Sequence, residues 1–186
     1  MTDGASKPSA DELALSAGLY IVATPLGHAR DISLRALDVL AAADMIYCED
    51  TRNSAKLLAY HGIKTATFAY HEYNGAKARP KILAALAAGQ RLALISDAGT
   101  PLISDPGMKL VRDARAAGHA IIAIPGASAP IAALSVSGLP SDRFTFAGFL
   151  PPKTAARQSA LEGLKSARGG TLVLFEAARR LAALLD

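Results

Sequence analysis

The chain has 186 residues, which is room for one ordinary domain, or for one domain and part of a second. Hydrophobic residues make up 51% and charged residues 19%, which argues against a globally disordered chain; Trp is absent and aromatic residues are only 5%, so the core has to be aliphatic. The 20 Lys and Arg residues exceed the 16 Asp and Glu residues and give a net charge of +4, which permits a nucleic-acid partner without requiring one, because no dense basic block occurs.

Cysteine content and hydropathy exclude further classes. Cys48 is the only cysteine, so neither a disulfide within the chain nor a CxxC metal or redox site is possible. Residues 1–17 are polar and rich in small side chains, without the apolar run of a signal peptide, and we expect them to form a flexible tail. No segment reaches the roughly 18–20 uninterrupted apolar residues that span a bilayer. We therefore expect a cytoplasmic protein with no membrane partner.

Short apolar runs alternate with helical patterns after this tail. Strands are predicted at 19–23, 44–48, 65–70, 91–95 and 120–124, and helices at 33–43, 53–61, 80–88, 109–117 and 129–136. Repeated strand–helix units favour parallel strands joined by right-handed crossovers. The prediction is an N-terminal α/β domain over residues 18–136, with a five-stranded, mostly parallel sheet and helices on both faces.

A second, shorter region follows a predicted linker at 137–143. We expect a strand at 144–150, a helix at 154–167, a strand at 171–176 and the start of a helix at 177–185. Two strands and two helices are too few to bury an independent sheet. We therefore interpret residues 144–186 as the beginning of a truncated C-terminal α/β domain.

The unusual residues follow the predicted strands, in loops at 24–27, 49–52, 96–101 and 125–128. Ligands of open parallel sheets bind beyond the carboxyl ends of the strands. Gly99 and Gly126 let the main chain approach a ligand closely, and hydroxyl groups such as those of Thr100 and Ser128 supply directional hydrogen bonds. A plain turn explains any one loop equally well, but the four together favour a binding crevice. The dinucleotide GxGxxG, the Walker GxxxxGK[ST] and the GxSxG nucleophile elbow are all absent.

The longest motif is SDAGTPLISDPG at 96–107. With LYIVATPLG at 19–27, EDTR at 49–52 and GLPSDRF at 138–144, it resembles the ribosomal RNA small subunit methyltransferase I family of the tetrapyrrole methylase superfamily. The resemblance runs from residue 19 to the end of the chain. It implies two α/β domains with S-adenosylmethionine between them, and 2′-O-methylation of a cytidine in the decoding region of 16S ribosomal RNA. The implied partners are the small ribosomal subunit and a second copy of the protein, in a homodimer.

The resemblance also implies cofactor contacts. Gly99-Thr100-Pro101 stands where the superfamily has a Gly-Asp-Pro loop that embraces the methionine part of the cofactor, and Thr100 in place of the aspartate is usual in the RNA branch. The implied contact residues are Leu26, Gly27, Ala98, Gly99, Thr100, Ile103, Ser128, Ala129 and Glu176. No metal is implied.

The catalytic residues are less defined. Methyl transfer to a ribose hydroxyl needs the oxygen, the methyl carbon and the sulfur in line, and a base near the weakly acidic hydroxyl would help. Our hypothesis is that Asp50 or Asp97, just past strand ends that face the crevice, is this base. The alternative is structural: Asp50 pairs with Arg52, and Asp97 caps a turn.

Two other functions stay open. A tetrapyrrole methyltransferase would share the fold, although the SDAGTPLISDPG form of the loop argues against it. A non-catalytic module that binds a ligand or RNA becomes a serious alternative if the chain naturally ends at Asp186. The candidates for RNA phosphate contacts are Arg30, Arg52, Arg143, Lys153 and Arg157.

Overall fold

The computed structural model describes residues 15–166 and 169–185. The chain divides into two compact units, residues 1–127 and residues 128–186. The predicted boundary at residue 136 lies after the helix at 129–136, whereas the structure groups this helix with the second unit, where it contacts a strand at 171–175. The predicted tail at 1–17 falls, up to residue 14, outside the described residues.

The first unit is a doubly wound α/β sheet. Its strands are β1 (Gly18–Val22), β2 (Met45–Cys48), β3 (Thr67–Ala69), β4 (Arg91–Leu94) and β5 (Ile121–Ile124), and its helices are α1 (Leu34–Ala42), α2 (Thr51–Tyr60), α3 (Gly75–Ala87) and α4 (Met108–Ala116). All neighbouring strands are parallel, in the order β3-β2-β4-β1-β5. The predicted fold class is confirmed.

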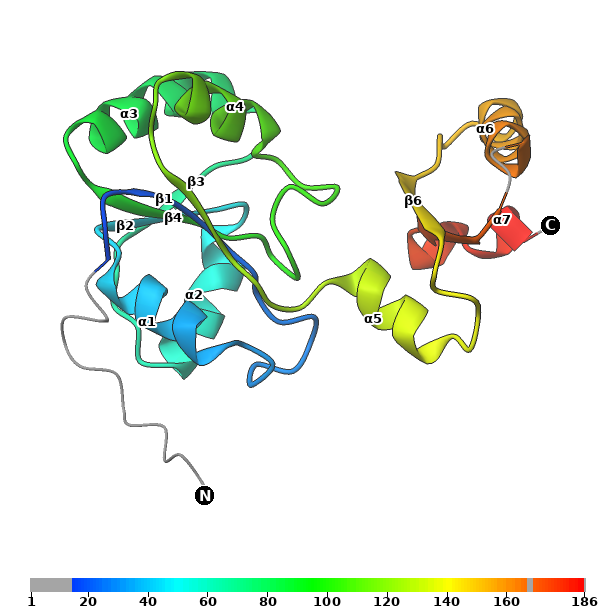
Figure 1. Cartoon of the computed structure of the whole chain (residues 1–186), viewed down its shortest axis with the longest axis horizontal. Helices are drawn as coiled ribbons and strands as arrows, with labels where there is room; N and C mark the ends of the chain where they lie inside the picture. The colour runs from blue at the N-terminus through cyan, green and yellow to red at the C-terminus, as the bar shows by residue number, and fades with distance from the viewer. Residues whose placement is uncertain (1–14, 167–168, 186) are drawn as a thin grey trace. The chain divides into compact units, whose positions relative to one another are not determined.

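Helices cover both faces of this sheet, α1 and α2 on one and α3 and α4 on the other (Figure 1). Helices α1 and α2 connect strands in the direction of the β3 edge of the sheet, and α3 and α4 connect strands in the direction of the β5 edge. Because all these crossovers have the same hand, the two helix pairs lie on opposite faces. Successive strand residues alternate between the two layers. Tyr20 and Val22 of β1 pack in the α1–α2 layer, and Leu19 and Ile21 pack in the α3–α4 layer.

Two helices begin two or more residues earlier than predicted. Helix α2 begins at Thr51 because Asp50 accepts a hydrogen bond from the backbone N–H of Arg52 and thereby caps the helix. Helix α3 begins at Gly75 and runs through Pro80, which was the predicted first residue. Pro80 removes one helical hydrogen bond, but packing of the later turns in the core outweighs this loss. No helix in the described part of the chain is long and apolar enough to cross a membrane.

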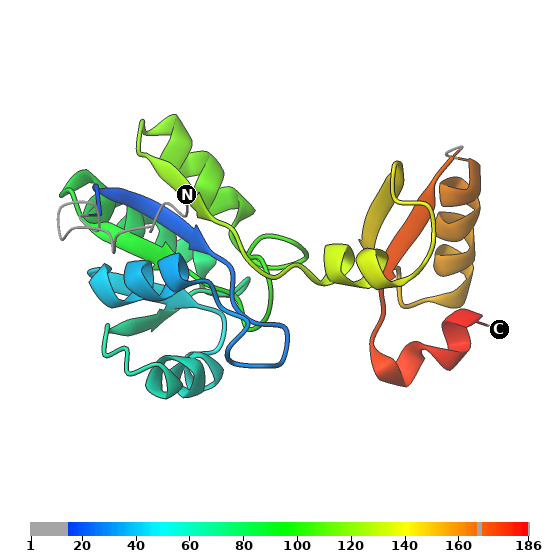
Figure 2. The same cartoon turned by 60° about the horizontal axis from the view of Figure 1, so that its bottom comes forward.

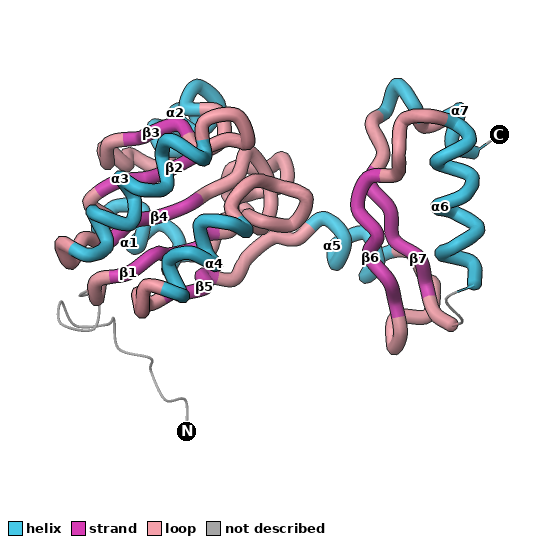
Figure 3. The backbone as a smooth tube through the Cα atoms, turned by 90° about the horizontal axis from the view of Figure 1, so that it is seen from above, coloured by secondary structure: helices cyan, strands magenta, loops and turns pink. Residues whose placement is uncertain are grey.

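The second unit contains a two-stranded parallel sheet. Its elements are α5 (Ala129–Val136), β6 (Phe144–Phe149), α6 (Thr154–Ser166), β7 (Thr171–Phe175), a 3-10 helix (Ala178–Arg180) and α7 (Ala182–Leu185). Figure 3 shows β6 and β7 side by side. The rings of Phe146 and Phe175 meet edge to face with their centroids 4.8 Å apart, which joins the two strands. The single helix predicted at 177–185 is a 3-10 turn followed by a short α-helix.

Candidate functional site

The loops after β1 and β4 meet at the carboxyl edge of the first unit's sheet (Figure 2). The N–H of Thr24 donates to the Gly99 carbonyl at 2.9 Å, and the N–H of Gly99 donates to the Thr24 carbonyl at 3.0 Å. The buried Thr24 hydroxyl donates to the Ser96 carbonyl at 3.0 Å. Strands β1 and β4 are neighbours whose chains leave toward opposite faces, which is where open α/β sheets bind ligands.

Backbone geometry fixes the shape of the loop at 96–107. Gly99 has a φ of +80°, and a Cβ placed on it would lie 3.1 Å from Cδ2 of Leu26. Leu102 and Ser104 also have positive φ, of 72° and 68°, a conformation that costs free energy in residues other than glycine. The Thr100 hydroxyl donates to the Ala127 carbonyl at 2.9 Å and so joins this loop to the one after β5.

Six of the predicted cofactor residues share this edge of the first unit. Leu26 and Gly27 follow β1, and Ala98, Gly99, Thr100 and Ile103 follow β4. The Leu26 and Ile103 side chains are 39% and 40% exposed, so apolar surface is available beside the Gly99 backbone. The structure thus brings together two predicted loops that are far apart in the sequence.

The other three predicted contact residues, Ser128, Ala129 and Glu176, belong to the second unit. Ser128 precedes α5, but its side chain makes no capping hydrogen bond. One carboxylate oxygen of Glu176, Oε1, accepts the N–H of Ala177 at 2.7 Å and pairs with Arg180 at 2.6 Å. The other, Oε2, is buried and has no hydrogen-bond partner among the described residues. A buried acceptor of this kind is suited to a donor from a ligand.

The two predicted catalytic carboxylates both have protein partners. Asp50 caps α2 and pairs with Arg52 at 3.2 Å, as the structural alternative expects. Hydrogen bonds from the Arg52 side chain, and then from its backbone, lower the pKa of Asp50. Asp97 accepts the N–H of Asp50 at 3.3 Å and the side-chain amide of Asn53 at 3.0 Å, so it ties the loop after β4 to the start of α2.

Asp105 is a carboxylate that the sequence analysis did not single out. Partial burial raises the pKa of Asp105, against the effect of a hydrogen bond with Ser96, and nearby Asp97 raises it further. Burial, followed by the charges of Asp105 and Asp97, also raises the pKa of Glu49. Asp105 lies inside the SDAGTPLISDPG motif, which is the one signal that could have identified it.

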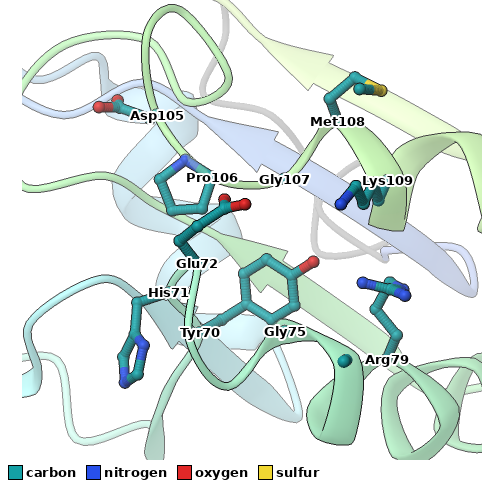
Figure 4. A pocket seen from close by; sticks show the side chains of 11 residues that line it. Tyr70, His71, Glu72, Gly75, Arg79, Asp105, Pro106, Gly107, Met108 and Lys109 are labelled. Carbon is teal, nitrogen blue, oxygen red and sulfur yellow. The ribbon is translucent and has the colours of Figure 1, made fainter.

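A cavity of about 310 Å³ borders the end of this loop (Figure 4). Asp105 and Glu72 supply acidic groups to its lining, and Arg79 and Lys109 supply basic ones. Arg79 is held by Asp113, with Nε 3.1 Å from Oδ2. The cavity therefore offers both donors and acceptors. Its lining depends on the packing of α3 against α4, for which the sequence pattern carries no signal.

Curated relatives are similar in sequence to most of this chain. The chain is 58% identical over 168 residues to the "Ribosomal RNA small subunit methyltransferase I" of Mesorhizobium japonicum, which covers 90% of this chain and 57% of the relative. It is 50% identical over 163 residues to the protein of the same name from Escherichia coli O157:H7, which covers 88% of this chain and 57% of the relative. The chain thus spans less than two thirds of the length of these relatives.

Solved structures share the fold. Diphthine synthase superimposes with a TM-score of 0.68 at 18% identity, over 86% of this chain and 65% of the other. Uroporphyrin-III-C-methyltransferase from Thermus thermophilus gives a TM-score of 0.55 at 21% identity, over 75% of this chain and 61% of the other. The family model that describes tetrapyrrole (corrin/porphyrin) methylases matches residues 18–186. The chain therefore belongs to the tetrapyrrole (corrin/porphyrin) methylase family.

Proposed function

We propose that this protein is an enzyme that transfers a methyl group from S-adenosylmethionine to the 2′-hydroxyl of a cytidine in the 16S RNA of the small ribosomal subunit. The observation that carries the proposal is the 50–58% identity to relatives named for methylation of small-subunit ribosomal RNA. Family membership over residues 18–186 supports methyl transfer as the reaction class.

The cofactor is proposed to bind against the loops after β1 and β4. Without a side chain, the Gly99 backbone can approach the methionine part of the cofactor closely, and the exposed side chains of Leu26 and Ile103 give it apolar contacts. The other proposed contacts are Gly27, Ala98, Thr100, Ser128 and Ala129, and the free Oε2 of Glu176 as an acceptor. When bound, the cofactor's sulfonium group supplies an activated methyl group, so these residues have only to position it.

Three carboxylates are candidates for the proton acceptor. Asp50 is a poor base, because Arg52 stabilises its charged form and lowers its pKa. Asp97 holds the start of α2, and Asp105 combines partial burial with a place in the cavity lining. We expect Asp105→Asn to lower the rate of methyl transfer more than Asp50→Asn, with the cofactor affinity of both variants retained.

The measurement for this comparison is single-turnover transfer to unmodified small subunits as a function of pH. The transfer rate of the wild type should rise with pH, as the acceptor loses its proton, and Asp105→Asn should flatten this rise. An unchanged profile in Asp105→Asn would remove Asp105 from the candidates, and a flattened profile in Asp97→Asn would select Asp97.

A tetrapyrrole methyltransferase is the second candidate, and the family description favours it. Methylation assays on small subunits and on uroporphyrinogen with the same preparation separate the two.

The homodimer stays a prediction that sedimentation velocity checks. A cytoplasmic location is proposed because small ribosomal subunits are there.

The cofactor site is tested by calorimetric titration with S-adenosylmethionine of the protein as its gene encodes it. We expect saturable binding that Gly99→Val weakens at least about tenfold, because a side chain there would press against Leu26, one of the proposed cofactor contacts. Gly118→Val is the matched control: Gly118 also has a φ of +80°, but nothing lies within 4 Å of its Cβ position. If the wild type does not bind S-adenosylmethionine, the proposal is wrong. If Gly99→Val and Gly118→Val weaken binding equally, backbone strain explains the loss of affinity and the Gly99 site is not supported.

A further inference from the structure

A groove lies at the outer edge of the first unit's sheet, between strand β3 and helix α3. It has a volume of about 480 Å³, and Met45, Tyr47 and Phe68 of the sheet line it together with Lys77 and Lys81 of the helix. We call this the β3–α3 groove. Phe68 is 45% exposed although its ring lies against Tyr47, with the centroids 5.8 Å apart. The Phe68 ring thus packs on Tyr47 on one side and is accessible to a ligand on the other.

The charges around the β3–α3 groove have one sign. Lys77 and Lys81 are four residues apart on one face of α3, and no Asp or Glu residue lines the groove. None of the ion pairs found within residues 15–166 and 169–185 involves either lysine. The cavity at the carboxyl edge differs, because Glu72 and Asp105 line it. The β3–α3 groove is therefore complementary to a polyanion.

The edge strand is poorly suited to pairing with a strand of a second copy. Strand β3 has only three residues. The Ala69 carbonyl already accepts the side-chain amide of Asn74 at 2.9 Å, and Oδ1 of Asn74 accepts the N–H of His71 at 2.9 Å. Short edge strands with occupied backbone groups resist strand addition, and a two-fold contact through this groove would bring lysines of like charge together.

We propose that the β3–α3 groove binds a single-stranded segment of the RNA substrate, with one base stacked on Phe68 and the adjoining phosphates beside Lys77 and Lys81. An open aromatic ring next to cationic side chains is the usual arrangement in single-strand binding sites. Helix α3 connects the two hollows, since Gly75 and Arg79 line the cavity at the carboxyl edge. RNA in the groove would thus continue toward the proposed cofactor loops. This inference rests on the proposed function, which makes RNA the substrate.

The test is fluorescence anisotropy of a labelled single-stranded RNA of about 12 nucleotides, titrated with the protein as its gene encodes it at several salt concentrations. The double variant Lys77→Gln/Lys81→Gln should lower the slope of log affinity against log salt by about 1.4, because two phosphates of a single strand are no longer neutralised by the protein. The matched control is Lys56→Gln/Lys64→Gln, which removes two exposed lysines elsewhere on the same unit and should leave the slope unchanged.

Stacking is tested separately at Phe68. Phe68→Ala should weaken RNA binding about 5- to 100-fold without changing the salt slope, and Phe68→Tyr, which keeps the ring, should restore it. Thermal melts show whether Phe68→Ala remains folded. If it does not, the lysine variant decides, because its substitutions lie on the helix surface.

The outcomes separate the groove from the methyl-transfer proposal. If Lys77→Gln/Lys81→Gln keeps the RNA affinity and the salt slope of the wild type, the proposed RNA site in the groove is wrong. It is also wrong if the wild type self-associates and this variant abolishes the self-association while RNA binding persists. Cofactor titrations of the same preparations test the proposed function independently. RNA binding that depends on the groove, without cofactor binding, would support the groove and contradict the enzyme. A wild type with no affinity for this RNA would overturn the groove alone, and the cofactor titration would still decide the proposed function.

Discussion

Asp44 and Arg91 join the beginnings of two neighbouring strands, β2 and β4. The Arg91 backbone N–H donates to Oδ2 of Asp44 at 2.7 Å, and Nη2 pairs with Oδ1 at 2.6 Å. The side-chain hydrogen bond from Arg91, followed by the backbone one, lowers the pKa of Asp44 from 3.8 to about 2. The pair thus favours the ionised carboxylate in the folded state.

Asp44→Asn should therefore destabilise the first unit at pH 7. The fall in pKa corresponds to at most about 2.5 kcal/mol, and we expect about 1 kcal/mol because the two side chains are 31% and 37% exposed. The lowered pKa makes this contribution complete above pH 3.8 and removes it as the pH falls through about 2. Urea unfolding at pH 7 and pH 2 measures this difference. Asp38→Asn, an exposed carboxylate on α1, is the control, and an equal loss at both pH values would contradict the ion-pair explanation.

At the scale of elements, two hydrophobic layers hold the helices to the sheet. Ile46 of β2 is fully buried in the α1–α2 layer, and Ile82 of α3 is fully buried in the α3–α4 layer. The sheet separates the two side chains. Each layer therefore depends on its own helix pair.

Ile46→Val and Ile82→Val should each destabilise the protein by about 0.5–1.5 kcal/mol, because each removes one buried methylene from a close-packed layer. Their effects should add within about 0.5 kcal/mol in the double variant, since the two side chains share no partner across the sheet. Chemical denaturation of the four proteins checks this. Leu34→Ala, at a side chain that is 80% exposed, should change stability by less than about 0.5 kcal/mol. A larger coupling would mean that the two layers repack together.

Elements also show where sequence patterns are reliable. Helix α5 lies at its predicted bounds, and each predicted strand of the first unit is present within one residue at each end except for β3. Strand β3 has three residues instead of the predicted six, because it pairs on only one side and its flanking residues enter loops. Pro80 was misinterpreted as a helix start, since local propensity does not include the packing of Ile82 and Leu86.

For the whole molecule, the parallel arrangement brings distant segments to one edge of the first unit. Thr24 and Gly99 are 75 residues apart and exchange two backbone hydrogen bonds. Asp97 reaches Asn53 across 44 residues. Because every strand runs the same way, these loops have to share the carboxyl edge, and this allows loops with different motifs to form one site.

The sequence by itself determined the α/β class, the order of the elements and the sheet edge at which its motifs gather, because hydrophobic period and turn residues are local signals and repeated strand–helix units have few possible topologies. The tertiary structure decided which partners individual side chains have. Asp50 and Asp97 are engaged by Arg52 and Asn53, Asp105 is partly buried in the lining of a cavity, and Phe68 of β3 is exposed beside two lysines. These differences depend on burial and on partners that are distant in the sequence, and neither is encoded in a local pattern.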